Sequence, residues 1–189
     1  KDIVTVVGFE AEQVKQAVGE GVKFIYNPYY RDSSSIYSLW KARREMNDDL
    51  LILNSDIVYT KDFLKALSDV AKVHLPICLA VNSQRPFEEV DVGVQIKSSR
   101  VVRVGKGLPK ELCHAESVDG FFVAREGCQK VKNVMMNLLR ISISKGGIFS
   151  LKNELATETP LDFEDVENSC MEFDTVEEYQ KVLQVFTKQ

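Results

Sequence analysis

Patterns typical of β-strands and of α-helices alternate along the first eighty residues, and this alternation limits the possible folds more than any other feature. Strand patterns occur at 2–8, 22–27, 50–54 and 77–82, and helical spacing of apolar residues occurs at 9–18, 36–46 and 61–72. Strands that alternate with helices form a parallel sheet covered on both faces. An α/β protein is therefore predicted.

In the second half of the chain the regular alternation of strand and helix patterns ends. The stretches 91–97 and 101–105 flank the turn "SSR" and predict an antiparallel hairpin. A strand at 116–124, a long helix at 126–144, a less regular segment at 145–160, a short strand at 169–174 and a final helix from Thr175 follow. We therefore expect a Rossmann-like three-layer α/β/α fold with a mixed, mostly parallel central sheet, in a single domain spanning 1–189.

Composition excludes several classes of protein. With 189 residues, 44% of them hydrophobic and 28% charged, the chain is long and apolar enough for one folded core and is unlike a disordered chain. The net charge is -4 and the only basic cluster is "KARR" at 41–44, so no nucleic acid is expected as a partner. No stretch approaches the ~18 apolar residues of a membrane span, and no signal peptide is apparent.

The four cysteines are widely spaced and only two histidines are present, so the sequence favours neither a zinc site nor a disulfide framework. Reduced thiols and a cytoplasmic location are expected. A homodimer is one alternative for the assembly, with the hairpin at 91–104 and the helix at 126–144 as the subunit contact. The apolar residues of that helix fit a place in the core equally well.

Two acids follow predicted strands. Asp56 ends the run "LLILNSD", and Asp174 ends "CMEFD", just before a T-x-x-E capping box formed by Thr175 and Glu178. Ligands of open α/β sheets bind at the carboxyl ends of the strands, so both carboxylates could project into one crevice. Two carboxylates suit Mg²⁺ that takes its other ligands from phosphates and water. The alternative is that both acids only cap or precede helical segments.

Three stretches, in the same order, resemble one enzyme family. "NPYYRDSSSIYSLWKARREMNDDLLILNSDIVY", "VVRVGKGL" with "AESVDGFFVA", and "MEFDTVEEYQKV" are similar to segments of nucleotidyltransferases of the phosphocholine and phosphonate cytidylyltransferase type. The resemblance implies Mg²⁺ at Asp56 and Asp174, and a nucleotide base against the serine run. It also implies that Lys106 acts near the acceptor phosphate and that Glu116 contacts the acceptor.

Each of these implied roles has a plainer alternative. Ser33, Ser34 and Ser35 could cap a helix, Lys106 could lie in a solvated turn, and Glu116 could be a charge at a strand edge. The family also begins with a strand and a Gly-rich loop whose N–H groups cradle the triphosphate, whereas the first residues here resemble the family's second strand and helix. We therefore expect that the N-terminal strand and loop are absent from this sequence.

The resemblance implies transfer of a nucleoside monophosphate, CMP in the first instance, from a nucleoside triphosphate to a phosphorylated small molecule such as phosphocholine, a phosphonate or inositol phosphate. Pyrophosphate is the other product. A sugar-1-phosphate nucleotidyltransferase and a catalytically silent regulatory relative are the alternatives. A glycosyltransferase of similar topology is disfavoured, because Asn54-Ser55-Asp56 stands where such enzymes usually have Asp-x-Asp.

Overall fold

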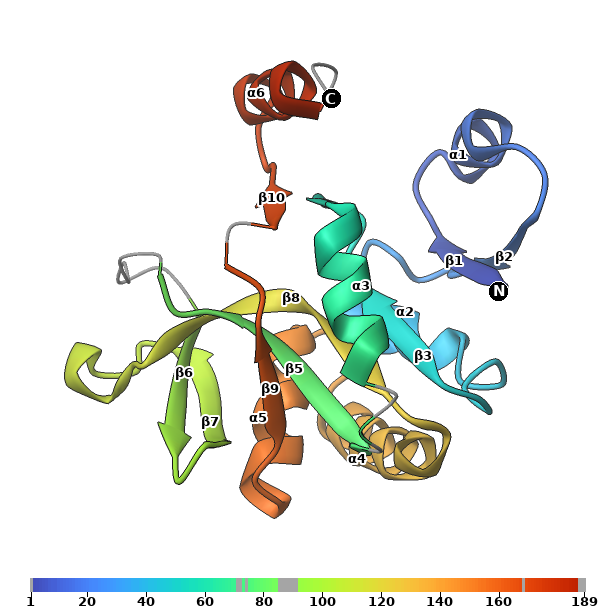
Figure 1. The fold of residues 1–189 in the computed structure, drawn as a ribbon. Coiled ribbons are helices and arrows are strands. Elements are labelled where there is room, and N and C mark those ends of the chain that lie inside the picture. The colour runs from blue at the N-terminus through green and yellow to red at the C-terminus, as the bar shows by residue number, and fades with distance from the viewer. Residues whose placement is uncertain (1, 71–72, 74, 85–91, 168, 187–189) are drawn as a thin grey trace.

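The computed structural model describes residues 2–70, 73, 75–84, 92–167 and 169–186. Its elements alternate between strand and helix in the first half of the chain and then include the predicted hairpin, as expected (Figure 1). The strands are β1 (Ile3–Val7), β2 (Val22–Tyr26), β3 (Leu50–Leu53), β4 (Ile57–Tyr59), β5 (Ile77–Asn82), β6 (Val92–Lys97), β7 (Arg100–Lys106), β8 (Ala115–Val123), β9 (Asp162–Asp165) and β10 (Cys170–Glu172). The helices are α1 (Ala11–Val18), α2 (Ser35–Lys41), α3 (Lys61–Val70), α4 (Cys128–Ile141), α5 (Ile148–Glu158) and α6 (Val176–Phe186), with 3-10 turns at η2 (Lys110–Leu112) and η3 (Arg125–Gly127).

The central sheet is mixed. Its strands follow the order β7-β6-β8-β5-β9, and β3 also pairs with β8. Because β3, β5 and β6 all run antiparallel to β8, and β9 runs parallel to β5, the strands β3, β5, β6 and β9 share one direction. The predicted mixed sheet with mostly parallel strand directions is confirmed.

One edge of β8 is shared by two strands. β3 pairs with residues 120–123 of β8, and β6 pairs with Ala115 and Glu116, whereas β5 pairs along the opposite edge. On this edge residues 117–119 lie between the end of β3 and the start of β6, and no described strand pairs with them there. The described structure thus has an open section of β8, residues 117–119, beside the end of β3.

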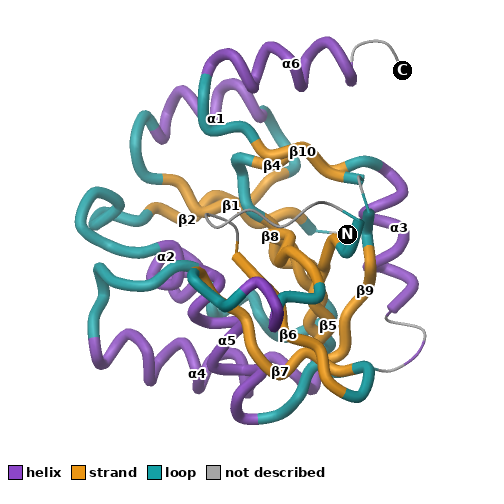
Figure 2. The backbone as a smooth tube through the Cα atoms, turned by 90° about the vertical axis from the view of Figure 1, so that its left-hand side faces the viewer, coloured by secondary structure: helices purple, strands orange, loops and turns teal. Residues whose placement is uncertain are grey.

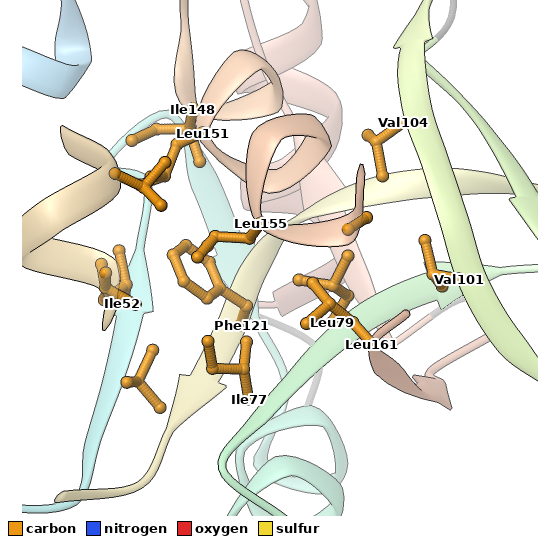
Figure 3. Packing of buried hydrophobic residues seen from close by; sticks show 14 of the residues in the cluster. Ile52, Ile77, Leu79, Val101, Val104, Phe121, Ile148, Leu151, Leu155 and Leu161 are labelled. Atoms are coloured by element: carbon orange, nitrogen blue, oxygen red, sulfur yellow. The ribbon is translucent and has the colours of Figure 1, made fainter. Parts of the chain in front are cut away.

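Helices cover both faces of the sheet, as Figure 2 shows with α3 on one side and α4 and α5 on the other. The alternation of side chains along β5 follows from its strand geometry, with Leu79 and Val81 toward α4 and α5, and Ala80 toward α3. The larger cluster includes Phe121, Leu151 and other buried residues drawn in Figure 3. The three-layer α/β/α prediction is confirmed.

The prediction of an irregular segment at 145–160 is wrong. Most of it forms α5, which begins after Gly146 at φ 83° and buries apolar residues on the face that packs against the sheet. These residues are Ile148, Leu151, Leu155 and Ala156.

The bounds of some predicted elements differ from those in the structure. The helix α2 ends at Lys41, whereas the predicted helix extends to residue 46. Residues 71–72 of the predicted helix at 61–72, and residue 91 of the predicted hairpin, lie outside the described part of the chain.

β1 and β2 form a separate parallel pair. β1 is bonded along one edge to β2, and β3 is bonded along one edge to β8. Within the described residues, the other edges of β1 and β3 have no partner strand. Both strands are apolar, and Ile3 and Leu53 are 59% and 40% exposed. The described part of the fold thus presents two apolar strands that each have one edge without a partner strand.

Candidate metal centre

A short antiparallel ladder carries the predicted acids. After β3 the chain turns at Asn54–Asp56 and enters β4, which pairs with β10 so that Ile57 lies opposite Glu172. The backbone N–H of Phe173 donates to the carbonyl oxygen of Asp56 at 3.0 Å. The ladder therefore brings the end of β3 against the residues that follow β10, although the two segments are far apart in sequence.

This pairing groups three carboxylates. One oxygen each of Asp56, Glu172 and Asp174 lies within 4.8 Å of the others. Asp56 and Asp174 are the two acids predicted from their positions at strand ends, and Glu172 is a third that the sequence analysis did not single out. The available signal was the E-F-D spacing, because residues two apart along an extended segment point to the same side. Their role as metal ligands stays a prediction.

The electrostatics of the cluster favour a cation. Burial, followed by the negative charges of Asp174, Asp119, Asp56 and Glu116, raises the pKa of Glu172. Asp56 Oδ1 is buried and has no hydrogen-bond donor among the described residues. An unpaired buried carboxylate oxygen is costly unless a cation or donor reaches it. Three carboxylates form an all-oxygen donor set, which suits Mg²⁺ or a similar hard divalent ion.

The capping box at the start of α6 is confirmed. The backbone N–H of Glu178 donates to Thr175 Oγ1 at 3.2 Å, and the N–H of Thr175 donates to Glu178 Oε2 at 2.9 Å. Glu178 Oε2 also accepts from the N–H of Asp174 at 2.9 Å, and these bonds lower the pKa of Glu178, that from Asp174 most. The cap therefore fixes the backbone of the candidate ligand Asp174 as well as the helix.

The serine run lies at the start of α2. Ser34 occupies the N-cap position, but its hydroxyl makes no capping bond and is buried without a partner among the described residues. Ser33 Oγ accepts from the side-chain amide of the fully buried Asn27 at 3.0 Å. The helix-capping alternative is therefore wrong for the Ser34 side chain, whereas contact with a nucleotide base stays a prediction.

The two predicted acceptor residues lie in different surroundings. Glu116 is partly buried on β8, and its charge acts on Glu172, so the structure brings it near the carboxylate cluster. Lys106 is exposed at the end of β7, with its ammonium 6.0 Å from the centre of the Phe149 ring, beside a cavity of about 300 Å³ that also has Arg103 and Asn153 in its wall. The described contacts of Lys106 thus connect it to α5 rather than to the carboxylates.

No protein-family profile and no curated protein matches the sequence. Solved structures do. The inositol-1-phosphate CTP transferase from T. maritima is 16% identical, with a TM-score of 0.74 over 98% of this chain and 75% of that chain. A protein assigned as a glucose-1-phosphate thymidylyltransferase from Bacillus anthracis is 15% identical, with a TM-score of 0.78 over 97% of this chain and 75% of that chain.

The CTP:phosphocholine cytidylyltransferase from Streptococcus pneumoniae is 15% identical, with a TM-score of 0.73 over 98% of this chain and 78% of that chain. The chain thus has the fold of these nucleotidyltransferases, as the sequence resemblance predicted.

In the described part of the chain, none of the helices has the length and apolar character needed to cross a membrane.

Proposed function

We propose that the protein is a Mg²⁺-dependent nucleotidyltransferase that transfers a nucleoside monophosphate, CMP as the first choice, to a phosphorylated small molecule and releases pyrophosphate. Phosphocholine, a phosphonate or inositol phosphate is the proposed acceptor. The proposal rests on one observation above all: Asp56 and Asp174, from opposite halves of the sequence, lie together with Glu172 within 4.8 Å. The shared fold of known nucleotidyltransferases supports it.

In this reaction an oxygen of the acceptor phosphate attacks the α-phosphorus of the nucleotide, and pyrophosphate leaves. The attacking oxygen is already anionic, so no protein group is needed as a general base. Asp56, Glu172 and Asp174 would hold Mg²⁺, which offsets the negative charge on the α-phosphate when bound. Glu116 and Lys106 would bind the acceptor, and Ser33, Ser34 and Ser35 would contact the base, so that the reacting groups are aligned.

A Gly-rich loop for the triphosphate is part of the proposal. The edges of β1 and β3 that have no partner strand among the described residues support it, because an apolar strand with a free edge can accept a further strand. We propose that an additional segment supplies that strand and, directly after it, the loop whose N–H groups bind the phosphates. A cytoplasmic location belongs to the same proposal and agrees with the four free cysteines.

The apolar face of α4 packs in the core, so a homodimer would use another surface.

A sugar 1-phosphate is the second candidate acceptor. The observation in its favour is the TM-score of 0.78 with the protein assigned as a glucose-1-phosphate thymidylyltransferase, against 0.74 and 0.73 for the two cytidylyltransferases. The two acceptor classes are distinguished by the phosphorylated compound that supports pyrophosphate release.

The test is pyrophosphate release by the full-length protein with Mg²⁺, each common nucleoside triphosphate, and a panel of phosphocholine, inositol phosphate, phosphonates and sugar 1-phosphates. We expect release with one acceptor class and loss of release in Asp56→Ala. Asp62→Ala, which removes a nearby exposed carboxylate outside the cluster, is the matched control and should retain activity. A folded protein that releases pyrophosphate with no combination would show a catalytically silent relative instead.

A further inference from the structure

Lys152 is a buried cation that the proposed reaction does not use. Its side chain on α5 is fully buried, and its ammonium contacts three oxygens of β8: Ser117 Oγ at 3.1 Å, Val118 O at 2.7 Å and Asp119 Oδ1 at 3.2 Å. Burial lowers the pKa of Lys152, and the charge of Asp119 opposes this. A buried ammonium is tolerated only with such partners. Lys152 thus fixes the open section of β8 between β3 and β6.

Asp119 carries the connection onward to the turn that bears Asp56. Its second carboxylate oxygen accepts from the side-chain amide of Asn54 at 2.9 Å. The hydroxyl of Tyr59 donates to the carbonyl oxygen of Asp119 and accepts from the backbone N–H of Asn54 at 3.0 Å. The turn Asn54–Asp56 is therefore held to β8 at its first residue, by two bonds that both lead to Asp119.

The direction of the Asp56 side chain depends on this turn. Asp56 Oδ1 has no hydrogen-bond donor within the described residues, so the carboxylate itself contributes little to its own placement. Its carbonyl oxygen is held by Phe173, which fixes one side of the turn, and Asn54 fixes the other. Asp119 is 31% exposed, and without Lys152 the Asn54 amide would be the one remaining partner of its carboxylate among the described contacts.

We propose that Lys152 is a positioning residue that acts through Asp119 and Asn54 to aim the Asp56 carboxylate at the divalent ion. The inference rests on the proposed function, because it concerns how the candidate metal ligand is held. Lys152 does not touch the substrate. Its buried ion pair keeps Asp119 in place, and Asp119 in turn keeps the Asn54–Asp56 turn in the geometry that groups the three carboxylates.

The test is a double-mutant cycle on ion binding, measured with Mn²⁺ by electron paramagnetic resonance on the full-length protein with nucleoside triphosphate present. We expect Lys152→Met and Asn54→Ala each to weaken Mn²⁺ binding about tenfold. The Mn²⁺ affinity of the double variant should equal that of the single variant that binds Mn²⁺ less tightly. Non-additive effects indicate that the two residues act through one path. Lys130→Met, which removes a lysine of α4 from a surface ion pair with Glu158, is the control and should bind as the wild type does.

Circular dichroism and thermal unfolding separate positioning from loss of fold. If Lys152→Met does not fold, Asn54→Ala still tests the path from Asp119 to the Asp56 turn, because it removes the Asn54–Asp119 bond and leaves the Lys152–Asp119 pair intact. Wild-type Mn²⁺ affinity in folded Asn54→Ala or Lys152→Met, or additive losses in the double variant, would overturn the inference alone. A wild-type protein that binds Mn²⁺ no better than Asp56→Ala would overturn the proposed function, and the inference with it.

Discussion

Phe173 donates its backbone N–H to the carbonyl oxygen of Asp56, and this bond extends the β4–β10 ladder toward Asp56 and Asp174, which lie far apart in the sequence. The ladder is a two-stranded sheet outside the central six strands. The grouping of Asp56, Glu172 and Asp174 therefore depends on a short pairing and on the turns at its ends. Small changes at those turns should alter ion binding without unfolding the core.

Ser34→Ala tests whether the buried hydroxyl of Ser34 serves a ligand or the fold. Because this hydroxyl makes no capping bond, we expect the free energy of unfolding to change by less than about 0.5 kcal/mol, although loss of a working N-cap usually costs about 1 kcal/mol. The KM for the nucleoside triphosphate should rise several-fold. Urea unfolding and initial-rate kinetics measure the two effects.

The control for this variant is Ser38→Ala. Ser38 Oγ accepts from the side-chain amide of the buried Asn27 at 3.1 Å, so its removal should destabilise the protein by about 1 kcal/mol. A Ser34→Ala variant that loses as much stability as Ser38→Ala and keeps the wild-type KM would show that the Ser34 hydroxyl is structural.

Thr175→Ala tests the cap that holds Asp174. The variant loses the bond from the N–H of Glu178 and a contact that orients the Glu178 carboxylate toward the N–H of Asp174. We expect about 1 kcal/mol less stability in the first turn of α6, faster amide exchange at Asp174 and Glu178, and Mn²⁺ binding weakened several-fold. Thr157→Ala, at an exposed hydroxyl of α5, should leave exchange in α6 unchanged. Unaltered exchange at Asp174 in Thr175→Ala would contradict the account of the cap.

The sequence was most informative where local pattern and tertiary environment agree. The apolar runs of β3 and β5, the hairpin and the T-x-x-E box were all predictable because strand alternation and capping are local properties. The helix α5 was missed because Lys152 interrupts its apolar face, and a lysine at such a position normally faces water. Its burial is explained by its oxygen partners at residues 117–119 of β8, which are distant in sequence and include the carboxylate of Asp119.

In the candidate site, too, local patterns predicted some residues, and tertiary pairing determines the others. Asp56 and Asp174 were found from their places at strand ends and from the family resemblance. Glu172 was missed because it sits inside a short strand pattern, and its approach to Asp56 depends on the β4–β10 pairing. Two tertiary features are encoded by no local pattern: the Asp56 oxygen that has no hydrogen-bond partner among the described residues, and the bond from the Asn54 amide to Asp119.

Glu164→Gln should make stability less dependent on pH. Burial, followed by the negative charges of Asp165 and Asp69, raises the pKa of Glu164 on β9. A raised folded-state pKa means that the wild type loses stability as pH rises from the ordinary range of a glutamate, about 4.3, through the higher folded value. The variant should thus be more stable than the wild type at pH 8 and equal to it near pH 4.

Urea unfolding at a series of pH values measures this difference, with the exposed Glu126→Gln as the control for general charge effects. A Glu164→Gln variant whose advantage grows as the pH falls would mean that the ionised carboxylate stabilises the fold, which is the opposite sign.

The most direct test of the metal centre is a crystal structure of the full-length protein with Mn²⁺ and a non-hydrolysable nucleoside triphosphate, using the anomalous scattering of manganese. The account predicts an anomalous peak at metal–oxygen bonding distance from carboxylate oxygens of Asp56, Glu172 and Asp174, with the nucleotide phosphates completing the coordination. Nucleotide bound in the crystal with no manganese at these carboxylates, or with manganese held elsewhere, would contradict it.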